Sequence, residues 1–259
     1  MPELPDLEVF SKNLNKRLAG KQVTEVTIHR SSQQLNVTPE TLTEALNNAS
    51  LSEVKRVGKT THFLFSNQQI LEVHLMLKGE FDIVPDDALV KSKFLSLRFD
   101  DDDYLVISDR QNLAKLTLAP KPSSVPEALD LTLEYLTKQL KKRTKRKIKA
   151  FLIDQKIVRG IGNAYSDEIL WESRIAPESL CAKIPEEAVN ALFNAIGAVL
   201  TDAIEQLQQQ KPDLLKGEYR DFLKIHNPNK THSPTGQPIH GKKIASKKTY
   251  YSDEQVCYS

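Results

Sequence analysis

The spacing of apolar residues divides the chain into a strand-forming part and a helical part. Apolar residues recur every three to four positions over 6–20 and the pattern stops at Gly20, which predicts an amphipathic helix with a defined end. A strand over 22–30 and a short helix over 39–49 follow. Seven further runs have strand-like patterns and are separated by turn residues: 52–58, 61–67, 70–77, 79–85, 93–99, 103–109 and 114–120. Residues 1–118 are therefore predicted to form an antiparallel β-sandwich or barrel with a leading helix.

The apolar period changes beyond a segment rich in Pro and Ser. Helical spacing dominates from about residue 129, and the apolar pattern thins from about Lys211. In the tail, 237–244 and 248–259 predict a short hairpin. The expected organisation is a β-rich domain over 1–118, a linker over 119–128, a helical domain over 129–221 and a small hairpin domain over 222–259. The fold class predicted is multi-domain α+β.

Charge is distributed unevenly along the chain. Residues 1–120 hold 14 Lys and Arg against 17 Asp and Glu, whereas residues 121–259 hold 22 against 17. The basic excess is concentrated in 141–149 (KKRTKRKIK) and 240–248 (HGKKIASKK). A run of Lys and Arg often forms a solvated helix face, but a basic half also favours a polyanionic partner.

Composition bears on the cellular compartment in which the protein is expected. At 39% hydrophobic residues, the 259-residue chain can bury a core. Cys181 and Cys257 are too few for a disulfide framework, and there is no pattern of an export leader. We expect no apolar run near the ~18 residues of a membrane span, and hence a cytoplasmic protein without a membrane partner.

One glycine-containing stretch, 157–178, suggests a site that can bind an anion. Gly160 and Gly162 flank Ile161, and Asn163 then opens an apolar-periodic helix that it can cap. The N–H groups at a helix N-terminus can bind an anion such as phosphate. A glycine turn followed by a helix cap, with no role in binding, is an alternative interpretation of the same stretch.

Four motifs together resemble the formamidopyrimidine-DNA glycosylase / endonuclease VIII family. The stretch 157–178 resembles its helix–two-turn–helix, and PELPD (2–6) resembles its N-terminal motif. KRVGKTTHFLF (55–65) resembles its strand with a phosphate-binding lysine, and ILEVHLMLKG (70–79) resembles the strand after it. The motifs occur in the family's order and span most of the chain.

The resemblance implies a catalytic role for the N-terminus. Removal of Met1 would leave Pro2 as a secondary amine, and an α-amino group has a pKa of about 7.7–8.0, so part of it is neutral near physiological pH. The resemblance implies that Pro2 attacks C1′ of a damaged nucleoside to form a Schiff base, and that Glu3 is the acid/base. It implies a phosphate contact for Lys59, and a rigid leader held by Pro5 that directs Pro2 into a cleft between the domains.

Further site residues follow from the resemblance and the basic runs. The DNA-binding residues expected are Lys145, Lys149, Gly162, Asn163 and Lys247. The residues expected to fill the space left by a flipped base are Leu77, Gln111 and Leu113. Leu113 is equally consistent with the start of a strand.

The chain departs from the family pattern in two places. Asp6 stands where the family has Glu, which shortens the side chain and keeps its charge. The tail lacks the four cysteines of the family's zinc finger, because its aligned positions hold His232, Thr235, Ser252 and Gln255, which are no zinc ligand set. We therefore expect a zincless finger and no cofactor, with apolar packing of Ile239, Ile244, Tyr250 and Tyr251 replacing the metal. Lys247 stands at the position of the finger's arginine, with the charge but without the bidentate fork.

The function expected is that of a bifunctional DNA glycosylase and AP lyase that cleaves the strand by β/δ-elimination. Its partner would be damaged double-stranded DNA, bound by a monomer in the cytoplasm, at the nucleoid in a bacterium. Because 211–222 is short where the guanine-lesion enzymes have a longer loop, we expect oxidised pyrimidines, ring-opened purines or abasic sites rather than mainly 8-oxoguanine. The alternatives are a catalytically weak DNA-binding protein with the same fold, and an RNA-binding helical module.

Overall fold

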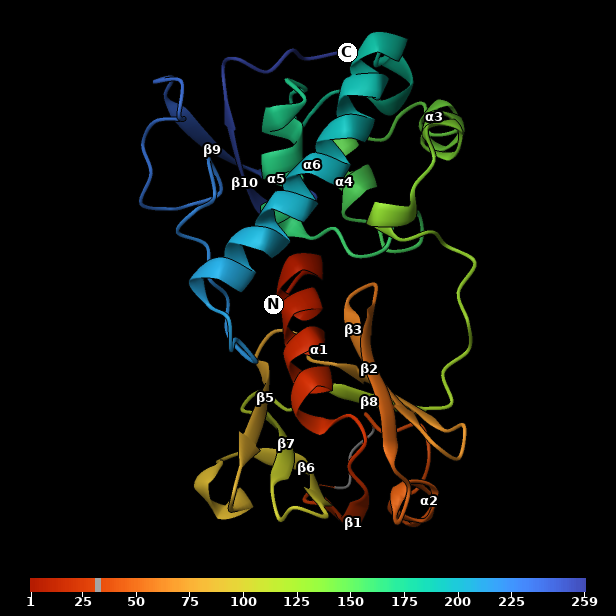
Figure 1. Ribbon diagram of the computed structural model, residues 1–259. Helices are drawn as coiled ribbons and strands as arrows, with labels where there is room; N and C mark the ends of the chain where they lie inside the picture. Colours follow the sequence, from red (N-terminus) through yellow and green to blue (C-terminus); the bar gives the residue numbers. More distant parts are fainter. Residues whose placement is uncertain (31–33) are drawn as a thin grey trace. The chain divides into compact units, whose positions relative to one another are not determined.

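The computed structural model describes residues 1–30 and 34–259, which form two compact units (Figure 1). The first unit comprises Met1–Pro122 and Leu207–Glu218, and the second comprises Ser123–Gln206 and Tyr219–Ser259.

The leading helix, α1 (Leu4–Leu18), begins at the N-terminal motif. Glu3 is its N-cap and Pro5 lies in its first turn, where the missing N–H of proline costs no helical hydrogen bond. The helix buries its apolar face and packs against strands β2 (Leu51–Val57) and β3 (Thr60–Phe65) (Figure 1). The predicted helix over 6–20 is thereby confirmed with slightly earlier bounds.

Two antiparallel four-stranded sheets form the β-rich part of the first unit. One has the order β1-β6-β7-β5 and the other the order β2-β3-β4-β8. The remaining elements are β1 (Val23–Ile28), α2 (Pro39–Leu46), β4 (Ile70–His74), β5 (Gly79–Val84), η1 (Asp87–Leu89), β6 (Lys93–Phe99), β7 (Tyr104–Asp109) and β8 (Lys115–Leu118). Phe63 of one sheet meets Phe81 of the other edge-on, with ring centroids 5.9 Å apart, inside a shared apolar core. The β-sandwich alternative is therefore confirmed.

The strand expected over 70–77 is shorter in the structure. β4 ends at His74 because the chain turns there, with Met76 in the left-handed region at φ 52°. The Gly79 N–H donates to the Leu75 carbonyl at 2.8 Å, and a Cβ on Gly79 would lie 2.4 Å from that oxygen. Only glycine fits this close approach. Leu77 is thus placed in an exposed turn rather than in a strand.

The second unit is helical and ends in a hairpin, as the sequence predicts. Its elements are η2 (Ala128–Asp130), α3 (Leu133–Lys141), α4 (Ile148–Leu152), α5 (Asn163–Glu172), η3 (Cys181–Lys183), most of α6 (Glu186–Gln210), β9 (Ile239–Ile244) and β10 (Lys247–Ser252). Between α4 and α5, the Gln155 side chain donates to the Ile161 carbonyl at 2.9 Å and accepts from the Gly160 N–H at 2.9 Å. These two bonds hold the double turn that joins the helices.

Helix α6 departs from one sequence expectation. By length and composition it is apolar enough to cross a membrane, with a mean hydropathy of 1.2 over its best window, of which 39% is buried. Leu192, Ile196 and Leu200 are fully buried at four-residue spacing. One buried stripe of this kind is typical of the core helix of a globular fold.

Candidate active site

Pro2 lies beside a pocket of about 300 Å³ in the first unit. The pocket is lined by Pro2, Leu77, Lys78, Gly79, Glu80, Gly217 and Glu218. The ammonium of Met1 precedes it and forms an ion pair with Glu218 Oε1. The N-terminal motif therefore places its proline at a cavity that has charged side chains of both signs.

Glu3 and Asp6 hold the start of α1 reciprocally. The Glu3 N–H donates to Asp6 Oδ2 at 2.8 Å, and the Glu3 carboxylate accepts from the Asp6 N–H, which completes a capping box. Glu3 is 4% exposed and Asp6 is fully buried. The shorter side chain of Asp6 thus has a defined contact: it fixes the backbone of the residue that follows Pro2.

Lys59 lies in the two-residue turn between β2 and β3. Val57 pairs with Thr60, and Gly58 takes a positive φ of 62° that allows the tight reversal. Lys59 is half-buried, and its charge lies close to His74. Burial first, and then the Lys59 ammonium, lower the pKa of His74, which favours its neutral form.

His74 is a residue of the site that the sequence motifs did not predict. Its Nδ1 accepts from the Met76 N–H at 2.9 Å, so it supports the turn that carries Leu77. Leu77 is 46% exposed and lines the same pocket as Pro2. The structure therefore brings Leu77 and Pro2 together.

Gln111 and Leu113 lie in the β7–β8 turn. Buried Asp109 accepts from the N–H groups of Gln111 at 2.8 Å, Leu113 at 2.5 Å and Ala114 at 2.7 Å. Leu113 is 37% exposed and precedes β8, so it does not start that strand. Gln111 lines a second, larger pocket of about 740 Å³, which shares Lys78 and Glu80 with the pocket of Pro2. Asp109 was missed, although an Asp before a turn is a common cap of backbone N–H groups.

Asn163 occupies the first position of α5 rather than its cap. The N-cap is Gly162, in extended conformation with φ −118°, so the expectation that Asn163 caps the helix is wrong. Asn163 Nδ2 donates to the Lys248 carbonyl of β10 at 2.9 Å, and its buried Oδ1 has no partner within residues 1–30 and 34–259. Since an amide nitrogen carries two N–H groups, one remains for a ligand at this helix N-terminus.

The structure corrects the role expected for Lys149. Its side chain is fully buried, and its Nζ lies 2.6 Å from Oδ1 of Asp167, which is also fully buried. The same Nζ donates to the Asn163 carbonyl and to Ser166 Oγ, both at 2.7 Å. A lysine enclosed in this way cannot reach a phosphate on DNA. Lys149 instead fixes the first turn of α5.

Lys145 and Lys247, in contrast, are exposed. Lys145 lies between α3 and α4, and Lys247 opens β10. The turn before Lys247 has Ala245 at φ 49° and Ser246 at φ 62°. Two left-handed central residues are typical of a tight hairpin turn, which usually selects Asn and Gly.

The tail hairpin of the second unit is held by a carboxylate as well as by apolar packing. Glu254 accepts hydrogen bonds from Thr235 Oγ1, Ser233 Oγ, Ser252 Oγ and Trp171 Nε1 at 2.6–3.1 Å, and pairs with Arg174 at 2.7 Å. The Thr235 hydroxyl, followed by the Ser252 hydroxyl, the indole of Trp171 and the Ser233 hydroxyl, lowers the pKa of Glu254 to about 2.

The hydrogen bonds of Glu254 add to the apolar packing that is expected to replace the metal. Ile244 and Tyr250 are buried, but Ile239 and Tyr251 are only half-buried. Two of the four aligned ligand positions, Thr235 and Ser252, donate to Glu254. A negatively charged group therefore accepts from the positions where the family has cysteines.

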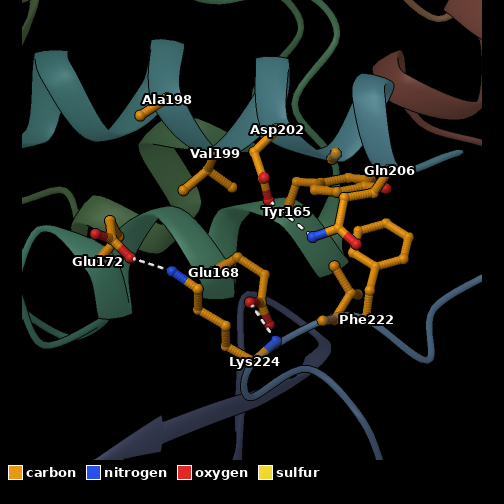
Figure 2. Close-up of a pocket in the computed structure, with 11 residues that line it drawn as sticks. Tyr165, Glu168, Glu172, Ala198, Val199, Asp202, Gln206, Phe222 and Lys224 are labelled. Atoms are coloured by element: carbon orange, nitrogen blue, oxygen red, sulfur yellow. Dashed lines mark hydrogen bonds and ion pairs between the residues drawn. The ribbon is translucent and has the colours of Figure 1, made fainter. Parts of the chain in front are cut away.

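A second buried acid ties the unit together from α5. Glu168 is 3% exposed and accepts from the backbone N–H groups of Lys224, Ile225 and His226 at 2.6–2.9 Å. Burial raises its pKa despite these bonds. Glu168 lines a pocket of about 300 Å³, and the Lys224 side chain donates to Glu172 at 2.7 Å. Figure 2 shows Glu168 and Glu172 of α5 on either side of the Lys224 side chain. These contacts fix the segment that leads into the hairpin.

The comparisons with known proteins agree with this architecture. Residues 1–116 match the family model of the formamidopyrimidine-DNA glycosylase N-terminal domain, and residues 118–212 match that of the formamidopyrimidine-DNA glycosylase H2TH domain. The formamidopyrimidine-DNA glycosylase of Carboxydothermus hydrogenoformans is 31% identical over 88% of this chain and 89% of its own. That of Pediococcus pentosaceus is 30% identical over 97% of both chains.

A solved structure is also similar to this chain. The complex between the Lactococcus lactis Fpg and a DNA containing an abasic site has a TM-score of 0.87 at 25% identity, covering 98% of this chain and 99% of that one. The chain therefore belongs to the formamidopyrimidine-DNA glycosylase family of base-excision-repair DNA glycosylases.

Proposed function

We propose that this chain is a bifunctional DNA glycosylase and AP lyase that acts as a monomer on damaged double-stranded DNA. We place it in the cytoplasm, at the nucleoid in a bacterial cell. The observation that carries the proposal is the position of Pro2, which follows Met1 directly, precedes the N-cap residue Glu3 and lines a pocket. The relative from Lactococcus lactis was solved with DNA containing an abasic site, which supports the same substrate class here.

The chemistry assigns one role to each of the two residues after Met1. With Met1 removed, the neutral Pro2 amine forms a bond to C1′ of the damaged nucleoside, and the C1′–base bond breaks with its electron pair leaving on the base. The bonded nitrogen then loses its proton to the Glu3 carboxylate, and its lone pair expels the ring oxygen, which takes that proton from Glu3; the product is an iminium between Pro2 and C1′. This cation withdraws electrons and permits β- and then δ-elimination of the two flanking phosphates.

Each unit contributes groups for the phosphates. We assign Lys59 in the first unit, and Lys145, Lys247, the N–H groups at Gly162 and the amide of Asn163 in the second. Cations and helix N-termini are the groups that position a DNA backbone without reading its sequence. Leu77, Gln111 and Leu113 are assigned to the gap left by the flipped nucleotide, because two of them are exposed apolar side chains on tight turns.

The preferred substrates proposed are oxidised pyrimidines, ring-opened purines and abasic sites. The short segment 211–222 supports this, because it leaves little chain to cover a large oxidised purine. The test is a panel of duplexes, each with one defined lesion, treated with protein from which Met1 is removed. Cleavage at 8-oxoguanine that is faster than at every other lesion would overturn the substrate assignment. No cleavage at any lesion or abasic site would overturn the enzyme assignment.

A further inference from the structure

The segment Leu207–Glu218 belongs to the first unit although it lies far from it in sequence. Asn13 Nδ2 of α1 donates to the Leu214 carbonyl at 2.9 Å, and Leu214 and Leu215 pack against the apolar core. The end of the segment is therefore fixed on α1 and the sheets.

Two further contacts determine where Glu218 lies. Lys216 forms an ion pair with Asp82 of β5. Gly217 then takes a φ of 80°, which favours glycine and turns the chain immediately before Glu218. Glu218 lines the same pocket of about 300 Å³ as Pro2, and its carboxylate is paired with the N-terminal ammonium of Met1.

The proposed chemistry requires a protein from which Met1, and with it this N-terminal ammonium, has been removed. Loss of Met1 makes Pro2 the new N-terminus, one residue further along the chain and at the wall of the same pocket. A secondary ammonium would then face Glu218, Glu80 and Lys78 in the pocket, with Glu3 next to it in the chain. Of the carboxylates, Glu3 is engaged at the helix cap, and Glu218 is the one that already pairs with an N-terminal ammonium.

We propose that Glu218 binds the Pro2 amine of the processed protein and accepts its proton when that amine becomes the nucleophile. The proposal rests on the proposed function of Pro2. The ammonium transfers one proton to the Glu218 carboxylate, the neutral amine forms its bond to C1′, and the base departs with the electron pair of the C1′–base bond. The departing base then takes the proton back from Glu218, so the carboxylate is restored and charge balances.

The first test observes the amine directly and needs no DNA. Protein labelled with ¹³C-proline, with Met1 removal verified by mass, is titrated by NMR and the Pro2 resonances are followed. A carboxylate beside an ammonium favours the charged form, so Glu218→Gln is expected to lower the titration midpoint of Pro2 by roughly one pH unit. Asp213→Asn removes the same charge from an exposed position of the same segment and is the matched control. Equal midpoints in wild type and Glu218→Gln would overturn the proposal.

The second test follows the chemistry. In single-turnover borohydride trapping on abasic DNA, the acid limb of the pH–rate profile should move to lower pH in Glu218→Gln and its plateau should fall. Glu218→Asp should recover part of the plateau. A merely structural role for Glu218 would lower the plateau and leave the limb in place, which would overturn the proposal. If the processed wild type forms no adduct at all, the proposed function fails, while the NMR titration still decides whether Glu218 binds the amine.

Discussion

The buried Lys149 offers a sharp test of the difference between a structural cation and a DNA-binding cation. We consider Lys149→Met, which keeps the length of the side chain and removes its charge. Asp167 would then keep a buried carboxylate without its ammonium partner, since both side chains are fully buried in the wild type. Breaking a buried ion pair in this way costs about 3–5 kcal/mol.

This loss should be visible as a large change in thermal stability. At roughly 2–4 °C per kcal/mol for a chain of this size, the melting temperature should fall by roughly 6–20 °C. The assay is thermal unfolding followed by circular dichroism, paired with DNA binding at several salt concentrations at 25 °C. The dependence of binding on salt should keep its wild-type slope, because no phosphate contact is lost.

Lys145→Met is the matched control, four residues earlier and exposed. It should change stability by less than about 0.5 kcal/mol. It should reduce the slope of log affinity against log salt by about 0.9, the contribution of one phosphate contact. The reasoning would be refuted if Lys149→Met melted within about 2 °C of wild type and lost one unit of salt slope.

Three further predictions concern other parts of the molecule. Lys59→Ala should reduce the salt slope by about 0.9 and slow single-turnover cleavage; an unchanged slope and rate would mean that Lys59 is only a turn residue. Because the folded-state pKa of Glu254 is about 2, below its ordinary 4.5, its stabilisation is complete above pH 4.5 and is lost as pH falls towards 2. Thermal melts of Glu254→Gln should therefore lack this acid-dependent loss of stability. Metal analysis of the wild type should find no stoichiometric zinc; a bound zinc would contradict a tail hairpin held by the Glu254 carboxylate. Replacing Ala245 and Ser246 by Asn and Gly should raise stability by about 1 kcal/mol, because both residues have positive φ; a lower melting temperature would contradict it.

The order and type of the elements could be predicted because local patterns determine them. The helix over 6–20, the strand runs and the tail hairpin each have their own periodicity and turn residues. The strand over 70–77 was predicted too long because its apolar residues continue through a turn. That turn depends on the close approach of Gly79 to Leu75, which the spacing of apolar residues does not indicate.

The site residues, like the helices and strands, could be predicted only where a local sequence pattern determines them. Pro2, Glu3 and Lys59 could be assigned because the motif places them by sequence alone. Lys149 was predicted to bind DNA because the sequence of a basic run does not show which of its lysines are exposed and which are buried. Its environment is created by Asp167, 18 residues later, which becomes a neighbour only when α4 and α5 pack.

Glu254 was missed for a related reason. The aligned ligand positions of the tail hold no metal-binding set, and their residue types give no sign of a carboxylate that binds them. The residue that collects their hydroxyls lies between two of those positions, at 254 between Ser252 and Gln255. Long-range contacts of this kind follow from the folded hairpin and from Trp171 and Arg174 of the helical segment, which the sequence places about 80 residues away.

The central claim is that the amine of Pro2 is the nucleophile. The most direct measurement is borohydride trapping on duplex DNA with one abasic site, followed by proteolysis and mass spectrometry of the adduct. With Met1 removed, the DNA-derived mass should lie on the peptide that begins at Pro2, and protein with an extra residue before Pro2 should form no adduct. An adduct mapped to a lysine, or equal trapping by the extended protein, would contradict the account.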